Sequence, residues 1–285
     1  MTGISVGRMN ELEVAREVEM GWFLMAPEAE DEEVLLPRRY VTQPLVPGAT
    51  ISVFVYADSE DRLLATTETP MAMVGEIAYL RVVEVNSVGA FLDWGLPKDL
   101  LLPYGEQKER LYEGDWCSVF VYKDKYADRV VASQRLNRHI GKTAATYSTG
   151  EKVSIDVVTR TDLGFKVVVN HKHWGLLYAN EVFRPMRRGL RMDAWVKRVI
   201  DGDKIDLRLD PPGKERFSQA ALTILAALEE ASFLPLHDKS APEDIRAQFG
   251  LSKKHFKAAI GHLYKSRKIA IEPNGIRILG NESSE

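Results

Sequence analysis

The sequence has one cysteine and no long apolar run, and each scarcity excludes a class of protein. Cys117 is the only cysteine among 285 residues, so the chain can form no internal disulfide and cannot build a thiolate zinc cluster. Its apolar surroundings predict a buried core position. No apolar run reaches the ~18 residues that suggest a membrane-spanning helix. The N-terminal segment lacks a basic region followed by an apolar core, so we expect no signal peptide and a cytoplasmic protein.

Sequence patterns of known catalytic sites are also missing. The chain contains no glycine-rich dinucleotide loop, no phosphate loop and no nucleophile elbow. His171 and His173 stand close together, but without an evident third ligand an exposed turn is favoured over a metal site. Asp201, Asp203 and Asp206 fit a turn and the start of a strand better than a magnesium site. We therefore expect that the protein is not an enzyme and that it binds no cofactor and no metal ion.

Charge is distributed unevenly along the chain, although the net charge is only −3. Residues 1–70 contain 5 basic and 13 acidic side chains, whereas residues 144–213 contain 12 basic and 9 acidic ones. A polyanion should therefore prefer the second half of the molecule. Apolar residues make up 45% of the chain, which indicates globular domains throughout, and its length allows two to four of them.

Three segments share one layout, and their first turn glycines, Gly21, Gly89 and Gly164, lie 68 and 75 residues apart. In each segment a β-branched run precedes that glycine, and a short strand and then an apolar strand follow it. A second glycine, an alternating strand, an aspartate-rich turn and a last strand complete the unit. Five short strands in about 70 residues predict a small barrel of the OB type.

The middle segment carries the motifs Gly75-Glu76-Ile77, Val88-Gly89-Ala90-Phe91-Leu92, Asp99-Leu100-Leu101-Leu102, Gly114-Asp115 and Asp128-Arg129-Val130-Val131-Ala132-Ser133. In these motifs it resembles the S1 RNA-binding domain, a family of OB barrels. The resemblance extends more loosely over residues 4–210. It implies a face on which aromatic rings stack on bases and basic groups contact phosphates.

At the binding positions that this resemblance implies, the chain departs from the S1 pattern. The aromatic residue before the turn glycine is replaced by Met20, Val88 and Leu163, and the second aromatic position holds Phe23, Phe91 and Lys166. We align the third-strand histidine with Leu36, Leu102 and Tyr178. An acid–base pair around the last turn is kept as Asp58 with Arg62, Asp124 with Arg129, and Asp201 with Lys204. For Phe23 and Phe91 the alternative to stacking is packing in a core or between domains.

The third segment is the most basic of the three. Arg184, Arg187, Arg188, Arg191, Lys197 and Arg198 lie within 15 residues. A charge run is commonly a solvated face, but the neighbouring Tyr178 and the OB frame favour phosphate contact here. The acidic first segment is instead predicted to be structural or to contact a protein, because it would repel phosphates.

The last seventy residues change from strand to helix periodicity after a linker at Asp210-Pro211-Pro212-Gly213. Helices are predicted at 214–231, from about Pro242 to Phe249 and at 253–268, followed by a hairpin over 269–278. Phe256, Ile260, Leu263 and Tyr264 are predicted to face the core, with Ser252 capping the third helix. This order is a winged helix, whose third helix enters a DNA groove in related folds. Its outer residues are lysines, which suit phosphates better than base edges.

We therefore predict a multidomain chain, mainly β with an α+β C-terminus: three S1-like OB barrels followed by a winged-helix domain. The domains are expected at 1–70, 71–143, 144–212 and 213–285. This order resembles the bacterial family called conserved virulence factor B, and the resemblance covers nearly the whole chain. It implies RNA binding, a regulatory role and cooperation between the last S1 unit and the winged helix.

The leading hypothesis is an RNA-binding protein that regulates gene expression after transcription, with single-stranded RNA as partner and no membrane. The residues predicted to contact RNA are Phe91, Arg129, Lys166, Tyr178, Arg187, Arg188, Arg191, Lys197, Arg198, Lys204, Lys253, Lys254, Lys257, Lys265, Arg267 and Lys268. The alternatives are a winged-helix DNA-binding regulator, an adaptor that binds a protein through the acidic first unit, and a nuclease.

Overall fold

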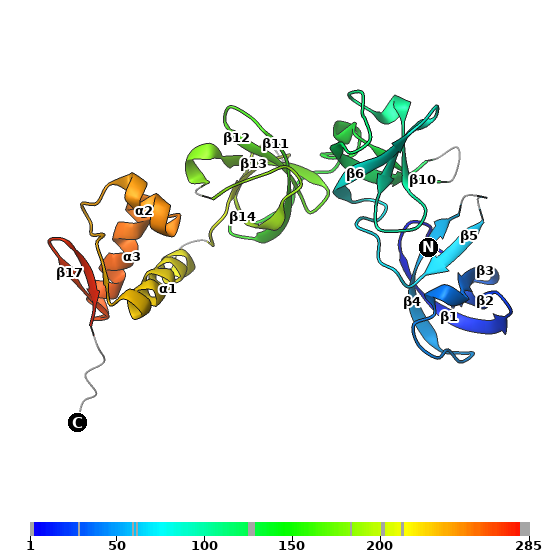
Figure 1. Cartoon of the computed structure of the whole chain (residues 1–285), viewed down its shortest axis with the longest axis horizontal. Coiled ribbons are helices and arrows are strands. Elements are labelled where there is room, and N and C mark those ends of the chain that lie inside the picture. Colours follow the sequence, from blue (N-terminus) through cyan, green and yellow to red (C-terminus); the bar gives the residue numbers. More distant parts are fainter. Residues whose placement is uncertain are drawn as a thin grey trace. The chain divides into compact units, whose positions relative to one another are not determined.

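The computed structural model describes residues 3–27, 29–58, 60, 62–124, 129–182, 184–200, 203–211 and 214–279. Within these ranges the side chains of residues 29–31, 180 and 214–219 are not described. The described residues form three five-stranded β-barrels and a C-terminal α+β region, as the sequence predicts (Figure 1). The expected linker residues Pro212 and Gly213 and the turn residues Asp128 and Asp201 lie outside the described residues.

The first barrel consists of β1 (Met9–Val18), β2 (Gly21–Ala26), β3 (Ala29–Pro37), β4 (Thr50–Ala57) and β5 (Leu63–Thr66). It closes in the order β1-β2-β3-β5-β4. The second comprises β6 (Ile77–Val85), β7 (Gly89–Asp93), β8 (Leu100–Pro103), β9 (Trp116–Lys123) and β10 (Val130–Ser133), in a nearly closed sheet of order β10-β9-β6-β7-β8. The third repeats the closed order with β11 (Lys152–Arg160), β12 (Gly164–Val169), β13 (His173–Tyr178), β14 (Arg191–Ile200) and β15 (Lys204–Arg208).

The three barrels share fine details that the repeat in the sequence only suggested. The register of the first strand shifts at the same place in each, between Val14 and Arg16, between Val82 and Glu84, and between Val157 and Thr159. Such a bulge bends a strand and increases its twist, which helps a short sheet to curl on itself. The bulge therefore belongs to the repeating unit and explains part of its curvature.

The turn glycines are required because the next strand of the barrel passes too close for a side chain. A Cβ atom on Gly21, Gly89 or Gly164 would lie 2.0–2.4 Å from a carbonyl oxygen of β3, β8 or β13. Gly164 also has a φ of +153°, which a residue with a side chain rarely adopts. The spacing of these glycines in the sequence thus reflects one steric constraint repeated three times.

Alternate residues of each strand point inward and fill each barrel with aliphatic side chains. Cys117 is among them: it is buried in the second barrel, as predicted, and burial raises the pKa of its thiol to about 12. The core of the second barrel also includes Phe54 and Tyr56 from β4, and the Phe54 ring meets Trp94 edge-on at 5.7 Å. The first two barrels therefore share apolar packing.

The C-terminal region contains α1 (Lys214–Ala231), α2 (Pro242–Phe249) and α3 (Lys253–Lys265) with strands β16 (Phe233–Leu234), β17 (Ile269–Glu272) and β18 (Gly275–Ile278). The predicted helices and hairpin are confirmed, although α3 ends at Lys265 rather than Lys268. Ser252 caps α3 by accepting a hydrogen bond from the backbone N–H of His255, and Gly250 ends α2 with a φ of +66°. Two-residue β16, which the sequence did not predict, pairs with β18.

The chain divides into two compact units, one of residues 1–143 with 171–173 and the other of residues 144–170 with 174–285. The division into the four predicted domains stays a prediction. In the part of the chain that the structure describes, no helix has the length and apolar character needed to cross a membrane.

Candidate nucleic-acid interface

The outer face of the third barrel is formed by alternate residues of β12, β13 and β15. Trp174, Leu176 and Tyr178 project outward from β13, because the residues between them, Gly175 and Leu177, face the core. Strand β15 runs parallel to β13 and places Lys204 opposite Trp174 and Asp206 opposite Leu176. Lys166 reaches the same face from β12. Aromatic and cationic groups from three strands therefore meet on one surface.

Trp174 is the aromatic ring of this face that sequence reasoning missed. The Lys166 ammonium lies 3.8 Å from the centroid of the indole ring. The S1 pattern has a ring at the position of Lys166, so in this barrel the ring comes from the adjacent strand and the cation lies over it. The strict alternation of β13, which puts Trp174 on the same side as Tyr178, was the signal that could have found it.

Tyr178 is surrounded by cations at the other end of β13. The Lys197 ammonium lies 5.8 Å from its ring centroid and is bonded to Glu181 at 2.6 Å. Arg198 bonds the buried carboxylate of Asp206 at 2.7 Å, and this bond, with a further one to Tyr178, raises the pKa of the guanidinium. A register shift between Val196 and Arg198 lets both neighbours, Lys197 and Arg198, point outward.

The histidine position of the S1 pattern was aligned incorrectly in the first two barrels. Gly164 packs against the carbonyl of Leu177 and the Cα of Tyr178, whereas Gly21 and Gly89 pack against the same atoms of Leu36–Pro37 and Leu102–Pro103. Tyr178 is therefore equivalent to Pro37 and Pro103. Leu36 and Leu102 are fully buried core residues. The alignment was wrong by one residue, because a run of leucines does not show from its sequence which residues face the core and which face outward.

In the second barrel, Phe91 and Arg129 line a hollow of about 270 Å³ together with Leu101, Lys98 and Asp99. Lys98 donates hydrogen bonds to the carbonyls of Ala57 and Asp58 at 2.8 and 2.6 Å. Burial, and then the nearby charges of Asp93 and Glu84, raise the pKa of Asp99. The hollow thus combines an aromatic ring with charged groups of both signs, two cations and one carboxylate.

The first barrel presents the least favourable S1 face. Phe23 lies beneath the guanidinium of Arg16, 4.5 Å from its ring centroid, and Arg16 is itself bound to Glu33. The predicted pair of Asp58 with Arg62 is present at 2.8 Å. The positions before the turn glycines, Met20, Val88 and Leu163, are 68%, 54% and 65% exposed, so each barrel has an aliphatic side chain where the S1 pattern has a ring.

The His171–His173 turn is not the exposed turn that we expected. Asn170 and His171 have positive φ, as in a tight turn, but His173 is buried and its Nε2 lies 3.0 Å from both the hydroxyl and the carbonyl oxygen of Thr143. His171 Nδ1 accepts a hydrogen bond from the N–H of Ile77 at 3.2 Å. No cluster of metal-ligating side chains is found among the described residues. Both histidines therefore take part in hydrogen bonds that hold the turn.

On the winged helix, α3 buries Phe256, Ile260 and Leu263, as predicted, but Tyr264 is 57% exposed rather than buried. The helical period puts Tyr264 beside the lysines of the outer face, because it lies seven residues after Lys257 and ten after Lys254. Lys257 is 3.7 Å from Asp238, and Lys253 donates to the carbonyl of Lys239 at 3.2 Å. Lys265, Arg267 and Lys268 are exposed at the end of the helix. The predicted lysine face thus also carries an aromatic ring.

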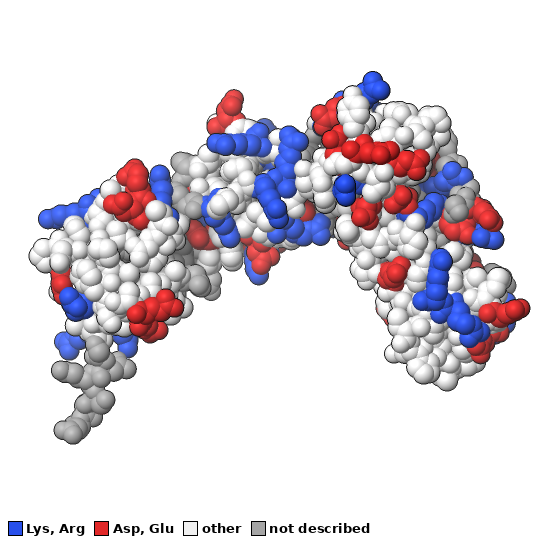
Figure 2. All heavy atoms as spheres, in the orientation of Figure 1, with Lys and Arg blue, Asp and Glu red and all other residues white. Residues whose placement is uncertain are grey.

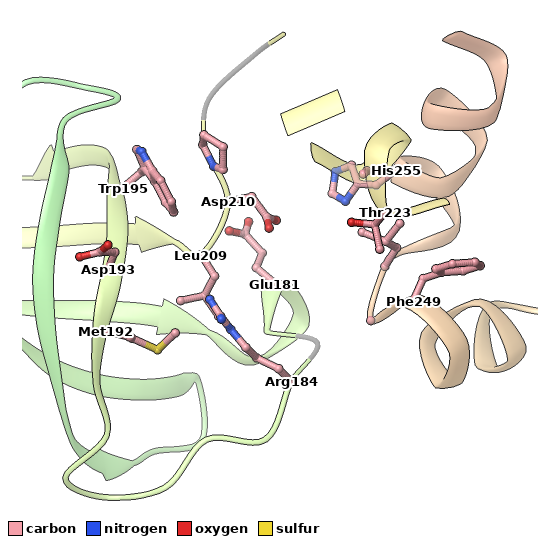
Figure 3. Close-up of a pocket in the computed structure, with 14 residues that line it drawn as sticks. Glu181, Arg184, Met192, Asp193, Trp195, Leu209, Asp210, Thr223, Phe249 and His255 are labelled. Carbon is pink, nitrogen blue, oxygen red and sulfur yellow. The ribbon is translucent and has the colours of Figure 1, made fainter. Parts of the chain in front are cut away.

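Figure 2 shows basic side chains gathered over the visible face of the third barrel and acidic ones prominent on the second. Some of the predicted contact residues there are neutralised within the barrel: Arg191 bonds Asp156 at 2.8 Å, in addition to the pairs of Lys197 and Arg198. Trp195 and Asp193 project from β14, and Arg184 lies with Glu181 and Leu209 (Figure 3). Arg187 and Arg188 are exposed on the loop after β13.

The comparisons with known proteins match this architecture. An S1 domain model matches residues 6–68 and again 74–135, which are the first two barrels, and a "CvfB-like winged helix domain" model matches residues 223–278. The chain contains two S1 domains and the CvfB-like winged helix domain, and it is similar over nearly its whole length to proteins named conserved virulence factor B. Its relatives of that name include a Staphylococcus aureus protein that is 26% identical over 292 residues, covering 96% of this chain and 94% of the relative.

Other similar proteins span most of the chain as well. The uncharacterized protein YitL of Bacillus subtilis is 26% identical over 271 residues, covering 92% of this chain and 90% of its own. A crystal structure described as a multidomain protein with nucleic acid binding domains from Streptococcus pneumoniae covers 96% of this chain and 98% of its own, with 25% identity and a TM-score of 0.41. Neither matched family model is of a catalytic domain. The S1 matches support nucleic-acid binding as the class of activity.

Proposed function

We propose that the protein binds single-stranded RNA with low sequence specificity and regulates gene expression after transcription. The observation that carries the proposal is the outer face of the third barrel, where Trp174 and Tyr178 on one strand are flanked by cations from other strands of the barrel. Four residues along a strand separate the two rings by about 13 Å. Every base has a π-face, so stacking on such rings tolerates any sequence.

The winged helix contributes a second cationic surface to this proposal. Between Lys253 and Lys265 the sequence contains no Asn, Gln or Arg, the side chains that most often read base edges. Lys254, Lys257 and Lys265 can contact phosphates, and Tyr264 offers a ring beside them. Contacts of this kind hold a strand without reading its sequence. We propose that this surface and the third barrel hold the same RNA.

The test is fluorescence anisotropy of the full chain with a labelled single-stranded RNA of ~20 nucleotides and a duplex DNA of matched length, each over a salt series. A strand of that length exceeds one OB binding site. We expect tighter binding of the RNA, weakened as salt rises, because phosphate contacts release counterions. Preference for the duplex would favour a DNA-binding regulator, and no binding of either at low salt would favour the protein adaptor.

A further inference from the structure

A hollow of about 250 Å³ opens at one end of the third barrel, apart from the outer face described above. Its apolar wall consists of Val157, Phe165 and Met186, and three arginines stand around it, Arg160, Arg187 and Arg188. Arg160 and Phe165 are direct cross-strand partners on β11 and β12, so they lie on the same side of the sheet. This is the inward side, where the end of the barrel opens between the two strands and the loop after β13.

Several cations of this barrel have an acidic partner, whereas the guanidinium groups of the three arginines have none among the described residues. Lys152, Arg191 and Arg198 are paired with Asp193, Asp156 and Asp206 at 2.7–2.8 Å. No carboxylate lines the hollow, and among the described residues no ion pair or hydrogen bond engages the guanidinium groups of Arg160, Arg187 and Arg188; Arg160 and Arg187 accept hydrogen bonds only through their backbone carbonyls. Three like charges around one concave site repel one another, and an anion would relieve that repulsion.

The other two barrels provide an internal comparison, because the same backbone carries different residues there. The N–H groups of Gly48, Gly114 and Gly189 each bond the equivalent carbonyl of the first strand, at 2.8–2.9 Å. This register aligns Arg187 and Arg188 with Val46 and Pro47 in the first barrel and with Tyr112 and Glu113 in the second. Cross-strand pairing aligns Arg160 with Glu17 and Val85. The arginines are therefore no requirement of the fold.

The chemistry of the hollow indicates a phosphate monoester. Guanidinium groups bind phosphate oxygens bidentately, and a monoester has three such oxygens and about −1.5 to −2 charge at pH 7. An internal phosphodiester has a single charge, and its chain must leave on both sides. The apolar wall closes the hollow inward, so a group with one ester bond fits it better. At about 250 Å³ it is also smaller than the ~300 Å³ from which pockets hold drug-sized ligands.

We propose that Arg160, Arg187 and Arg188 bind the terminal phosphate of an RNA strand. The inference extends the proposed function, on which it rests, by adding to the stacking face a site that recognises a strand end. A strand held there by its end would be favoured over an internal stretch of the same sequence. The same chemistry would also accept the phosphate of a free nucleotide, so the experiment must separate these two sources.

The experiment is a competition assay with the full chain and a labelled single-stranded RNA. Three unlabelled 12-nucleotide RNAs of one sequence serve as competitors: one with a 5′-phosphate, one with a 3′-phosphate and one with hydroxyls at both ends. We expect a phosphate-ended RNA to compete about tenfold better, the effect of one additional charge-assisted hydrogen bond. Arg160→Gln should abolish this advantage and leave the affinity for the hydroxyl-ended RNA unchanged.

The matched control is Arg184→Gln, which removes the same charge from the same barrel but from a side chain that lies with Glu181 and Leu209 (Figure 3). It should keep the tenfold advantage. Equal competition by all three RNAs with the unmodified protein would overturn the inference and leave the proposed function intact. The inference would also be overturned if both Arg160→Gln and Arg184→Gln lost the advantage of the phosphate-ended RNA. If no RNA binds at all, the proposed function fails, and calorimetric titration with adenosine monophosphate and adenosine tests the hollow alone. Binding of the monophosphate that depends on Arg160 would support a phosphate site for free nucleotides, and no binding would overturn it.

Discussion

Replacing Trp174 with alanine should weaken RNA binding without affecting the fold. A base stacked on an aromatic ring contributes about 1–3 kcal/mol. To stack on Trp174 a base must displace the Lys166 ammonium, and giving up that cation–π contact costs about 0.5–1 kcal/mol. At the middle of both ranges the net loss in the Trp174→Ala variant is about 1 kcal/mol, so the dissociation constant should rise about 5- to 10-fold.

The measurement is anisotropy of a labelled single-stranded RNA over a salt series, with thermal unfolding monitored in parallel. The slope of log affinity against log salt should stay unchanged, because no cation is removed. Trp116→Ala is the matched control, because Trp116 belongs to the second barrel and not to the proposed face. Its ring, on β9, is 53% exposed and stacks on Tyr79 of β6. Trp174→Phe should retain most of the affinity. Binding by Trp174→Ala within twofold of the unmodified protein, or an equal loss in Trp116→Ala, would refute the reasoning.

Three further predictions follow from other parts of the structure. The double variant Lys254→Gln, Lys265→Gln should flatten the salt slope by about 1.4, since each phosphate contact to a single strand contributes about 0.7, and an unchanged slope would exclude these lysines from the interface. Phe256→Ala should destabilise the winged helix by about 3–5 kcal/mol, because the ring is fully buried, and calorimetry should show that transition shift while the barrels unfold as before. Burial lowers the pKa of His139, which lies against Phe120 and Tyr122, so the folded state resists protonation of the imidazole. The free energy of unfolding should therefore fall as the pH drops below about 6.5, the pKa of histidine in an unfolded chain. His139→Phe should reduce this pH dependence when urea unfolding is compared between about pH 5 and about pH 8.

The order of elements could be predicted from the sequence because it depends on short-range patterns. Period-2 alternation in the barrels and the 3.6-residue period after residue 213 each follow from which side chains a strand or helix buries. Gly21, Gly89 and Gly164 mark turns because no side chain fits there, and Ser252 and Gly250 mark helix ends through local hydrogen bonding and a left-handed φ. These signals lie within a few residues of the feature they specify.

The binding surface was only partly predictable, because it depends on which strands become neighbours. Lys166 and Trp174 meet across two strands, and Arg198 reaches the outer face only through a bulge in β14. Tyr264 was assigned to the core although the neighbouring residues cover only one side of α3. The pairing of Lys197, Arg191 and Arg198 with carboxylates likewise joins residues 8–35 positions apart.

The sequence by itself therefore determined the three barrels, the winged helix and the basic character of the third barrel, since burial pattern, turn residues and composition are local properties of a chain. Only the tertiary structure decided which cations remain uncompensated. Arg160 is far from Arg187 and Arg188 along the sequence. Closure of the barrel brings the end of β11, which carries Arg160, to the loop after β13, which carries the other two. Whether a charge is neutralised or available to a ligand depends on distances of a few ångströms between segments, and the sequence does not contain those distances.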